Sequence, residues 1–271
     1  MTLSPALIVC APQRLNLPDI AMTLLFKRLL PACVAASCVL AGSAAHAAIQ
    51  LSSTRAIMNE KDRNVAVFAK NLTATPFVVQ AWIDGEKEEM ETPFFITPPL
   101  SRFDGSSERS LNITRVGDDM PKDRESYYWI NVLEIPQKSE SKDNSLTLAT
   151  RTRIKLFYRP AAIDKMPRGA EQSKWSIARD GKSCRLAVDN TSAYNINFAR
   201  VDVPGEPEGL GKTVVAKPLA TTYIPLGKCP AGAVSVTPQV VNDYGVIEAW
   251  PTVSAGERGA EAVQATVGGQ K

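Results

Sequence analysis

Histidine is almost missing from this sequence of 271 residues, since its single copy is His46. A Ser-His-Asp triad, a Cys-His pair and an imidazole zinc or copper site all need at least one histidine. His46 itself lies in a segment that we expect to be removed from the mature chain. The composition therefore argues against an enzyme, and we expect no metal site and no cofactor.

Long hydrophobic runs are also missing, because the one candidate, residues 29–40, is shorter than the roughly 20 residues that a bilayer demands. The surrounding segment has the order of a secretory signal: cationic residues 27–28, the apolar run, and Ala45-His46-Ala47 as a small-x-small cleavage site. We predict a cut after Ala47, export to the periplasm and no membrane insertion of the mature chain. The cationic part follows Met22, so Met1 and Met22 are both candidate initiators.

An excess of charge of one sign is the third absence. Removing the first 47 of 271 residues leaves 224 and takes away Arg14, Asp19, Lys27 and Arg28, so the formal net charge falls from +3 to +1. A phosphate backbone needs a concentrated basic stripe, which such a balance does not supply. We therefore expect no nucleic-acid partner.

Cysteine is sparse in the mature chain, where only Cys184 and Cys229 remain. In an exported protein, two cysteines predict one disulfide. Closing the loop between them would stabilise the folded state by roughly 4 kcal/mol in the chain-entropy model. The alternatives are a redox dithiol and a two-ligand metal site. Both fit poorly, because the spacing is not C-x-x-C and no histidine completes a coordination shell.

Helical periodicity is absent as well, and short β-branched and aromatic segments recur between Gly, Pro, Asn and Asp clusters instead. The predicted strands cover residues 65–70, 77–83, 127–135, 146–158, 184–188, 196–203, 221–226 and 234–241. This pattern predicts an all-β protein of two β-sandwich domains. We place a signal segment at 1–47, the domains at 48–160 and 165–254, and a flexible tail at 255–271.

The most informative segment is residues 144–160, NSLTLATRTRIKLFYRP. Its even positions are apolar or semi-polar, whereas Arg151, Arg153, Lys155 and Arg159 occupy odd positions, so one face of a strand would be apolar and the other cationic. One interpretation is that the segment is an ordinary edge strand, whose charges discourage aggregation and have no further role. Alternatively, the edge can pair with the backbone of a partner while alternate apolar side chains enter the partner's core.

Several motifs resemble those of the periplasmic pilus-assembly chaperones, the PapD and FimC family. The matching segments are residues 48–55 (AIQLSSTR), 76–84 (PFVVQAWID), 97–99 (TPP), 120–132 (MPKDRESYYWINV), 153–160 (RIKLFYRP) and 242–245 (NDYG). They occur in the family's order over nearly all of the mature chain. The resemblance implies two immunoglobulin-like domains in a boomerang arrangement, with residues 48–55 as an N-terminal strand that ends at Arg55.

The resemblance also implies functional residues. Arg55 and Lys155 would anchor the C-terminal carboxylate of a pilus subunit, and Leu146, Leu148 and Thr150 would be lent to the subunit as a donor strand. Glu125, Arg159 and Asp243 match an interdomain salt bridge. The sequence departs from the family at Thr150, where a larger apolar residue is usual, and at residues 190–194 (NTSAY), which lack both prolines of the family's turn.

These features together predict a non-enzymatic periplasmic chaperone. It would cap fimbrial subunits by donor-strand complementation, deliver them to an outer-membrane usher, and be able to self-associate through its exposed strand edge. The alternative is a secreted pair of immunoglobulin-like modules with a binding or adhesive role, which would not need Arg55 and Lys155 to converge.

Overall fold

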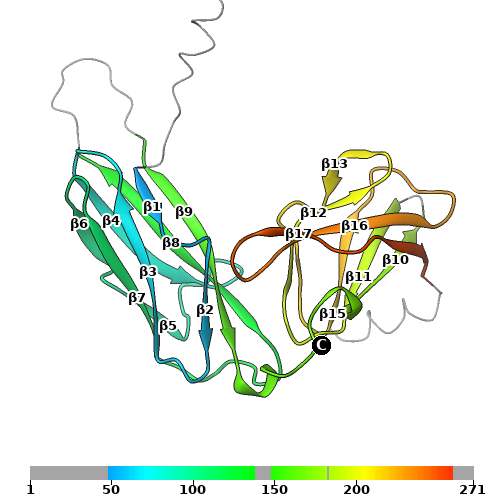
Figure 1. The fold of residues 1–271 in the computed structure, drawn as a ribbon, viewed down its shortest axis with the longest axis horizontal. Helices are drawn as coiled ribbons and strands as arrows, with labels where there is room; N and C mark the ends of the chain where they lie inside the picture. The colour runs from blue at the N-terminus through cyan, green and yellow to red at the C-terminus, as the bar shows by residue number, and fades with distance from the viewer. Residues whose placement is uncertain (1–47, 138–147, 182, 259–271) are drawn as a thin grey trace, which may run out of the picture. The chain divides into compact units, whose positions relative to one another are not determined.

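The first sandwich combines two sheets (Figure 1), and its buried core contains side chains from both of them. The computed structural model describes residues 48–137, 148–181 and 183–258. One sheet has the order β1 (Ile49–Leu51), β3 (Asn64–Asn71), β7 (Glu108–Arg115) and β5 (Phe94–Thr97). The other has the order β2 (Arg55–Asn59), β9 (Thr150–Arg159), β8 (Ser126–Pro136), β4 (Phe77–Asp84) and β6 (Leu100–Phe103).

Period-two alternation explains why these segments are strands. On β9, Ile154, Leu156 and Tyr158 enter the core of the first sandwich, while the intervening side chains face the other way. The same alternation places Ile130 and Val132 of β8 in that core, both fully buried. Each strand therefore gives one face to the interior and leaves the other for interactions outside it.

The second sandwich is formed by the later strands, and its sheets join into one hydrogen-bonded path. The order is β13 (Glu206–Leu210), β12 (Ile196–Val203), β16 (Val234–Val241), β18 (Val253–Glu257), β10 (Ser173–Asp180), β11 (Ser183–Asn190) and β15 (Ala220–Pro225). β14 (Val215–Ala216) pairs with β12, and β17 (Ile247–Ala249) with β16. β18 makes the junction, because it runs antiparallel to β16 and parallel to β10.

The segment between the sandwiches is held by specific contacts. It contains two 3₁₀ turns, η1 (Ala161–Ile163) and η2 (Ala170–Gln172). Ile163 is fully buried against Ala193 and Tyr194, and the Tyr194 hydroxyl donates to the carbonyl oxygen of Ile163 at 2.6 Å. The described residues of both sandwiches belong to one compact unit.

The turn at residues 190–194 closes without the family's prolines. The Asn190 amide donates to the carbonyl oxygens of Tyr194 and Ala216, and its Oδ1 accepts from the backbone N–H and the hydroxyl of Ser192. Asn and Ser side chains that bond nearby backbone can replace proline in fixing a turn. The departure from the family pattern therefore leaves the turn intact.

The all-β prediction is confirmed, and the strands predicted at residues 196–203 and 234–241 match β12 and β16 at both ends. Three boundaries were wrong. The strand predicted at residues 146–158 begins only at Thr150, as β9, because residues 148 and 149 lack strand pairing. Arg55 does not end the N-terminal strand but begins β2, because the chain crosses from one sheet to the other at residues 52–54. The predicted tail begins too early, because β18 extends to Glu257 and Ala255 is fully buried in the second core.

Within the described residues, no helix is both long and apolar enough to cross a membrane.

Candidate functional site

Arg55 and Lys155 lie side by side at the start of the parallel pair β2–β9, seen as neighbouring strands in Figure 1. Their Cα atoms are direct partners in the register. Directly opposed residues of neighbouring strands project on the same face of a sheet. Both cations therefore leave the five-stranded sheet on one side, where the Arg55 guanidinium lies 5.7 Å from the centre of the Phe157 ring.

Burial makes both charges costly. It lowers the pKa of Arg55, although the carboxylates of Asp243 and Glu125 offset part of the effect. Burial, followed by repulsion from Arg55, lowers the pKa of Lys155 from 10.5 to about 8. An anion placed between two such like charges would be bound strongly, because it would relieve the repulsion and replace lost hydration.

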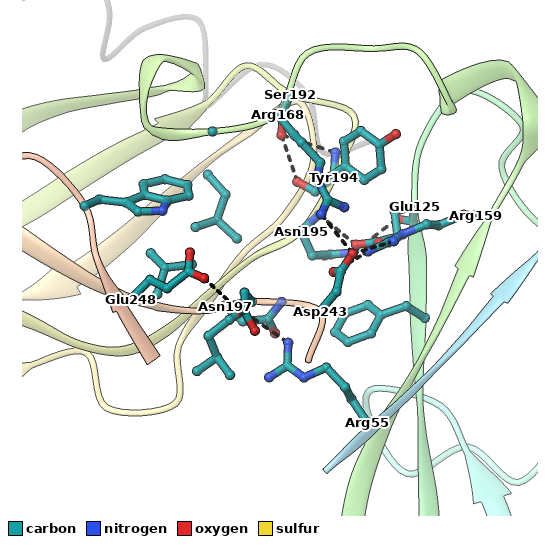
Figure 2. Close-up of a pocket in the computed structure, with 17 residues that line it drawn as sticks. Arg55, Glu125, Arg159, Arg168, Ser192, Tyr194, Asn195, Asn197, Asp243 and Glu248 are labelled. Atoms are coloured by element: carbon teal, nitrogen blue, oxygen red, sulfur yellow. Dashed lines mark hydrogen bonds and ion pairs between the residues drawn. The ribbon is translucent and has the colours of Figure 1, made fainter. Parts of the chain in front are cut away.

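The two cations are only partly hydrogen-bonded. Lys155 Nζ donates to Asn197 Oδ1 at 2.8 Å, and Arg55 Nη1 donates to the carbonyl oxygen of Val241 at 3.2 Å. Arg55 Nε is buried and has no hydrogen-bond partner in the described part of the chain. Figure 2 shows the Arg55 side chain reaching toward Asn197 of β12, beside a cavity of about 200 Å³ that Arg55, Asn197 and Val241 help to line.

A second cluster lies on the same cavity and centres on Arg159 (Figure 2). Arg159 donates to Glu125 Oε1 at 2.7 Å and, through both terminal nitrogens, to Asp243 at 2.7 and 2.9 Å. Arg168 adds a further bond to Asp243 at 2.8 Å. The other Glu125 oxygen accepts from the backbone and side-chain N–H groups of Asn195, both at 2.9 Å. The planar guanidinium of Arg159 on β9 thus joins Glu125, the residue before β8, to the turn that follows β16.

Hydrogen bonds and ion pairs stabilise the charged forms of Arg159 and Asp243. Burial opposes the charge on Arg159, but its hydrogen bonds and its attraction to Asp243 and Glu125 outweigh burial and raise the guanidinium pKa. Burial also opposes the charge on Asp243, yet the hydrogen bonds from Arg159 and Arg168 lower its pKa from 3.8 to about 2. Arg159 and Asp243 therefore both stay ionised at neutral pH.

The N-terminal half of β9 is an open edge. β8 pairs with β9 from Thr150 to Tyr158, whereas β2 covers only Lys155 to Arg159 on the other side. Within the described part of the chain, no strand pairs with that side of β9 between Thr150 and Ile154. Leu148 is 70% exposed and Thr150 is also exposed. Leu146 lies outside the described residues.

The odd-numbered face of β9 is not simply a solvated cationic stripe. The Arg151 guanidinium lies 5.1 Å from the ring centre of Trp82, and that of Arg153 lies 4.6 Å from the ring centre of Trp129. Both arginines also donate to the buried carboxylate of Asp84. These contacts fix the orientation of β9 and leave its edge and its even-numbered face available near Leu148 and Thr150.

Cys184 on β11 forms a disulfide with Cys229, with the sulfur atoms 2.03 Å apart. It belongs to the second sandwich, whose buried core includes Cys184. Among the described residues, no group of three or more His, Cys, Asp or Glu side chains could hold a metal ion.

Some residues of the site could not be recognised from the sequence. The site also contains three polar residues that bond to Lys155, Asp243 and Glu125, namely Asn197, Arg168 and Asn195 respectively. Nothing in their local sequence distinguishes them from surface polar residues. The aromatic contacts of Lys155 could have been predicted from the sequence. Tyr127 and Trp129 alternate on β8, and their rings lie beside Lys155 on the odd-numbered face of β9.

Two family models match the chain in the order of the two sandwiches. The pili and flagellar-assembly chaperone model, PapD N-terminal domain, matches residues 48–164. The pili assembly chaperone PapD C-terminal domain model matches residues 169–250.

Curated relatives agree over most of their length. The probable fimbrial chaperone LpfB of Escherichia coli O157:H7 is 35% identical over 216 residues, which cover 78% of this chain and 90% of the relative. The chaperone protein MrkB of Klebsiella pneumoniae is 34% identical over 221 residues, which cover 77% of this chain and 92% of the relative.

Solved structures share the fold. The E. coli chaperone DraB superposes with a TM-score of 0.63 at 31% identity, over 78% of this chain and 96% of that chain. A chain from the structure of the Salmonella enterica SafA pilin in complex with the SafB chaperone gives a TM-score of 0.65 at 25% identity, over 77% and 95%. Because both domain models match and relatives of about one-third identity extend over most of the chain, this protein belongs to the family of PapD-like pilus-assembly chaperones.

Proposed function

We propose that this chaperone binds pilus subunits in the periplasm, with Arg55 and Lys155 holding the subunit's C-terminal carboxylate and β9 pairing with its backbone. One solved relative is a complex of a pilin with a chaperone, which supports a subunit as the partner. Capping a subunit requires binding alone, so the proposal assigns no catalytic role to the protein.

The observation that carries the proposal is the pairing of two half-buried cations. Arg55 and Lys155 face the same side and repel each other, and the buried Arg55 Nε has no hydrogen-bond partner within residues 48–137, 148–181 and 183–258. A carboxylate has two oxygens, so it can accept from a guanidinium and an ammonium together in charge-assisted bonds of about 1.5 to 3 kcal/mol each. A chain terminus supplies such a group at the end of a strand.

The open edge of β9 explains how the rest of the subunit would be held. A guest strand beside Thr150–Ile154 would continue the line of β2 and satisfy the free backbone groups of that edge. Leu148, Thr150 and, by sequence alternation, Leu146 would then enter the subunit's unfinished core. Subunits with an exposed apolar groove would otherwise aggregate, and a second copy of the chaperone would compete for the same edge.

Export and delivery complete the proposal. The signal at residues 1–47 would direct the chain to the periplasm and be cut after Ala47. The capped subunit would then pass to an outer-membrane usher, where a better-fitting strand from the next subunit would replace β9. No nucleotide is required if the replacement strand binds more tightly than the one it displaces.

The test compares Arg55→Ala and Lys155→Ala with the matched control Arg102→Ala, whose side chain is 64% exposed on β6. Each variant is co-expressed with a subunit from the same fimbrial system, and co-purified subunit is measured. We expect at least a tenfold loss for the first two variants and no change for the control, with similar thermal unfolding in all three. Undiminished co-purification in both site variants would exclude this anchor.

A further inference from the structure

Glu134 carries a carboxylate into the interior of the first sandwich. It follows Ile130 and Val132 on the core-facing side of β8, and only 3% of its surface is exposed. Its Oε2 accepts a hydrogen bond from the backbone nitrogen of Ala48 at 3.0 Å, whereas its Oε1 is buried and has no hydrogen-bond partner among the residues that the structure describes. A buried carboxylate normally has a cation or several donors.

Ala48 is fixed in place opposite this carboxylate. It is 8% exposed, and its carbonyl oxygen accepts from the backbone nitrogen of Leu72 at 2.8 Å. The backbone N–H of Ile49, the first residue of β1, also acts to lower the pKa of Glu134, against the larger effect of burial. The carboxylate therefore joins β8 in one sheet to the beginning of β1 in the other.

The donors that reach Glu134 are backbone amides, and burial raises the pKa of its carboxyl group despite them. Within the described residues, no lysine or arginine forms an ion pair with Glu134. A positive charge at the Ala48 nitrogen would supply what the site lacks. Ala48 is also the residue that follows the predicted export cut.

We propose that Glu134 is a built site for the α-ammonium group of the processed chain, and that Ala48 is the mature N-terminus that occupies it. The inference rests on the export cut proposed above, but not on the capping of subunits. It assigns a processing site to the Ala47–Ala48 bond and gives the folded sandwich a way to recognise the product of that processing.

The chemistry is ordinary peptide hydrolysis by a signal peptidase, with water as the co-reactant. The C–N bond between Ala47 and Ala48 breaks, the water oxygen joins the Ala47 carbonyl carbon to form a carboxylate, and the nitrogen of Ala48 becomes an amine. At neutral pH this amine takes up a proton, since free α-amino groups have pKa values of about 7.7 to 8.0.

Processing changes one donor into three and adds a charge. The amide of the uncut chain can give Glu134 a single N–H, whereas an ammonium can donate to Oε2 and also to the unpartnered Oε1. A buried ion pair is most costly to break when one partner is removed. The mature sandwich should therefore tolerate a displaced or neutralised terminus poorly.

The first experiment measures the reactivity of the terminal amine. The full chain is exported from a Gram-negative host, purified and checked by intact mass, and it should begin at Ala48. Acetylation with an N-hydroxysuccinimide ester at pH 8 is then followed by mass spectrometry of the N-terminal peptide. We expect acetylation of Ala48 to be at least tenfold slower than in Glu134→Gln, because an amine held as ammonium is unreactive.

A second variant guards against misfolding of Glu134→Gln. One glycine inserted between Ala47 and Ala48 keeps the cleavage motif and Glu134 but moves the ammonium one residue away. Its terminal amine should react at least tenfold faster than that of the unmodified chain, and its urea midpoint should fall. In the Glu134→Gln background the insertion should have no further effect on the midpoint.

The outcomes separate the two claims. A mature chain that begins at another residue would overturn both the cut and the pair. A chain that begins at Ala48 but is acetylated as fast as the glycine variant would overturn the pair alone. Neither result would alter the subunit-capture test of Arg55 and Lys155.

Discussion

Arg55 and Lys155, one hundred positions apart in the sequence, are directly opposed Cα partners in a parallel strand pair. The pairing exists because the chain leaves the four-stranded sheet after β1 and enters the five-stranded sheet as β2. It sets two like charges on one face, and burial lowers the pKa of both. The strand crossover thus brings two cations together on one face, an arrangement that neither strand could form alone.

The first prediction concerns pH. The pKa of Lys155 is about 8 in the free chaperone, and a bound carboxylate would raise it, so binding above pH 8 requires proton uptake. Subunit affinity should therefore fall by up to about tenfold per pH unit above 8. Affinity is measured by titrating a peptide with the subunit's C-terminal sequence between pH 6.5 and 9.5.

Lys155→Arg is the matched control for this prediction. Arginine keeps its charge throughout that range, so the variant should bind less well at pH 7 because of its different shape but lose the pH dependence. Parallel pH profiles for the two proteins would show that Lys155 does not govern the titration.

The second prediction uses the exposure of Leu148. Because 70% of Leu148 is exposed, Leu148→Asp should change the free energy of unfolding by less than about 0.5 kcal/mol. Subunit capture should fall at least tenfold, because the new carboxylate would enter an apolar groove. Met90→Asp, at a loop residue that is 66% exposed, is the control and should retain capture. Equal capture by both variants would mean that Leu148 stays outside the subunit.

The strand pattern could be predicted well where β-branched residues alternate with polar ones. Residues 196–203 and 234–241 were located at both ends because each segment contains several valine or isoleucine residues between turn signals. β18 was missed because its buried residue is Ala255 and its neighbour is Gly256, which carry little hydrophobic signal. The crossover at residues 52–54 was missed because Ser-Ser-Thr contains no glycine or proline.

Only part of the site could be predicted from the sequence, and the reason differs from that for the strands. Arg55 and Lys155 could be named from family motifs, but their alignment depends on a parallel register that no local pattern encodes. Asn197 and Asn195 acquire their roles from tertiary contacts alone, at Lys155 and Glu125 respectively. Hydrogen bonds between residues far apart in sequence follow from the assembled sandwiches and not from propensity.

The third prediction concerns acid stability. The pKa of Asp243 is lowered to about 2 from 3.8, so its contribution to stability is complete above the unfolded pKa and is lost as pH falls through the folded value. The free energy of unfolding should therefore decline between about pH 4 and pH 2. Asp243→Asn should be less stable by about 1 to 2 kcal/mol at pH 6 and should decline less steeply in that window.

The control for Asp243 is Asp118→Asn. Asp118 forms a surface ion pair with Arg115 at 3.7 Å, and its side chain is 85% exposed. Such pairs contribute little, so this variant should follow the unmodified protein throughout a urea-denaturation series at stepped pH. If Asp243→Asn also followed it, the Arg159 cluster would not contribute to stability.

The last prediction concerns the exchange of β9 for another strand. Thr150 is exposed at the open edge, so Thr150→Ile adds apolar surface that can be buried only in a partner. At about 0.8 kcal/mol per buried methylene, subunit affinity should rise about three- to tenfold and strand exchange should slow in proportion.

Ala149→Ile is the control, because alternation places that exposed side chain on the opposite face. Exchange is followed with a labelled donor-strand peptide. Faster or unchanged exchange in Thr150→Ile would mean that this side chain does not enter the subunit, whereas slower exchange would indicate that threonine keeps the complex weak enough to release its subunit.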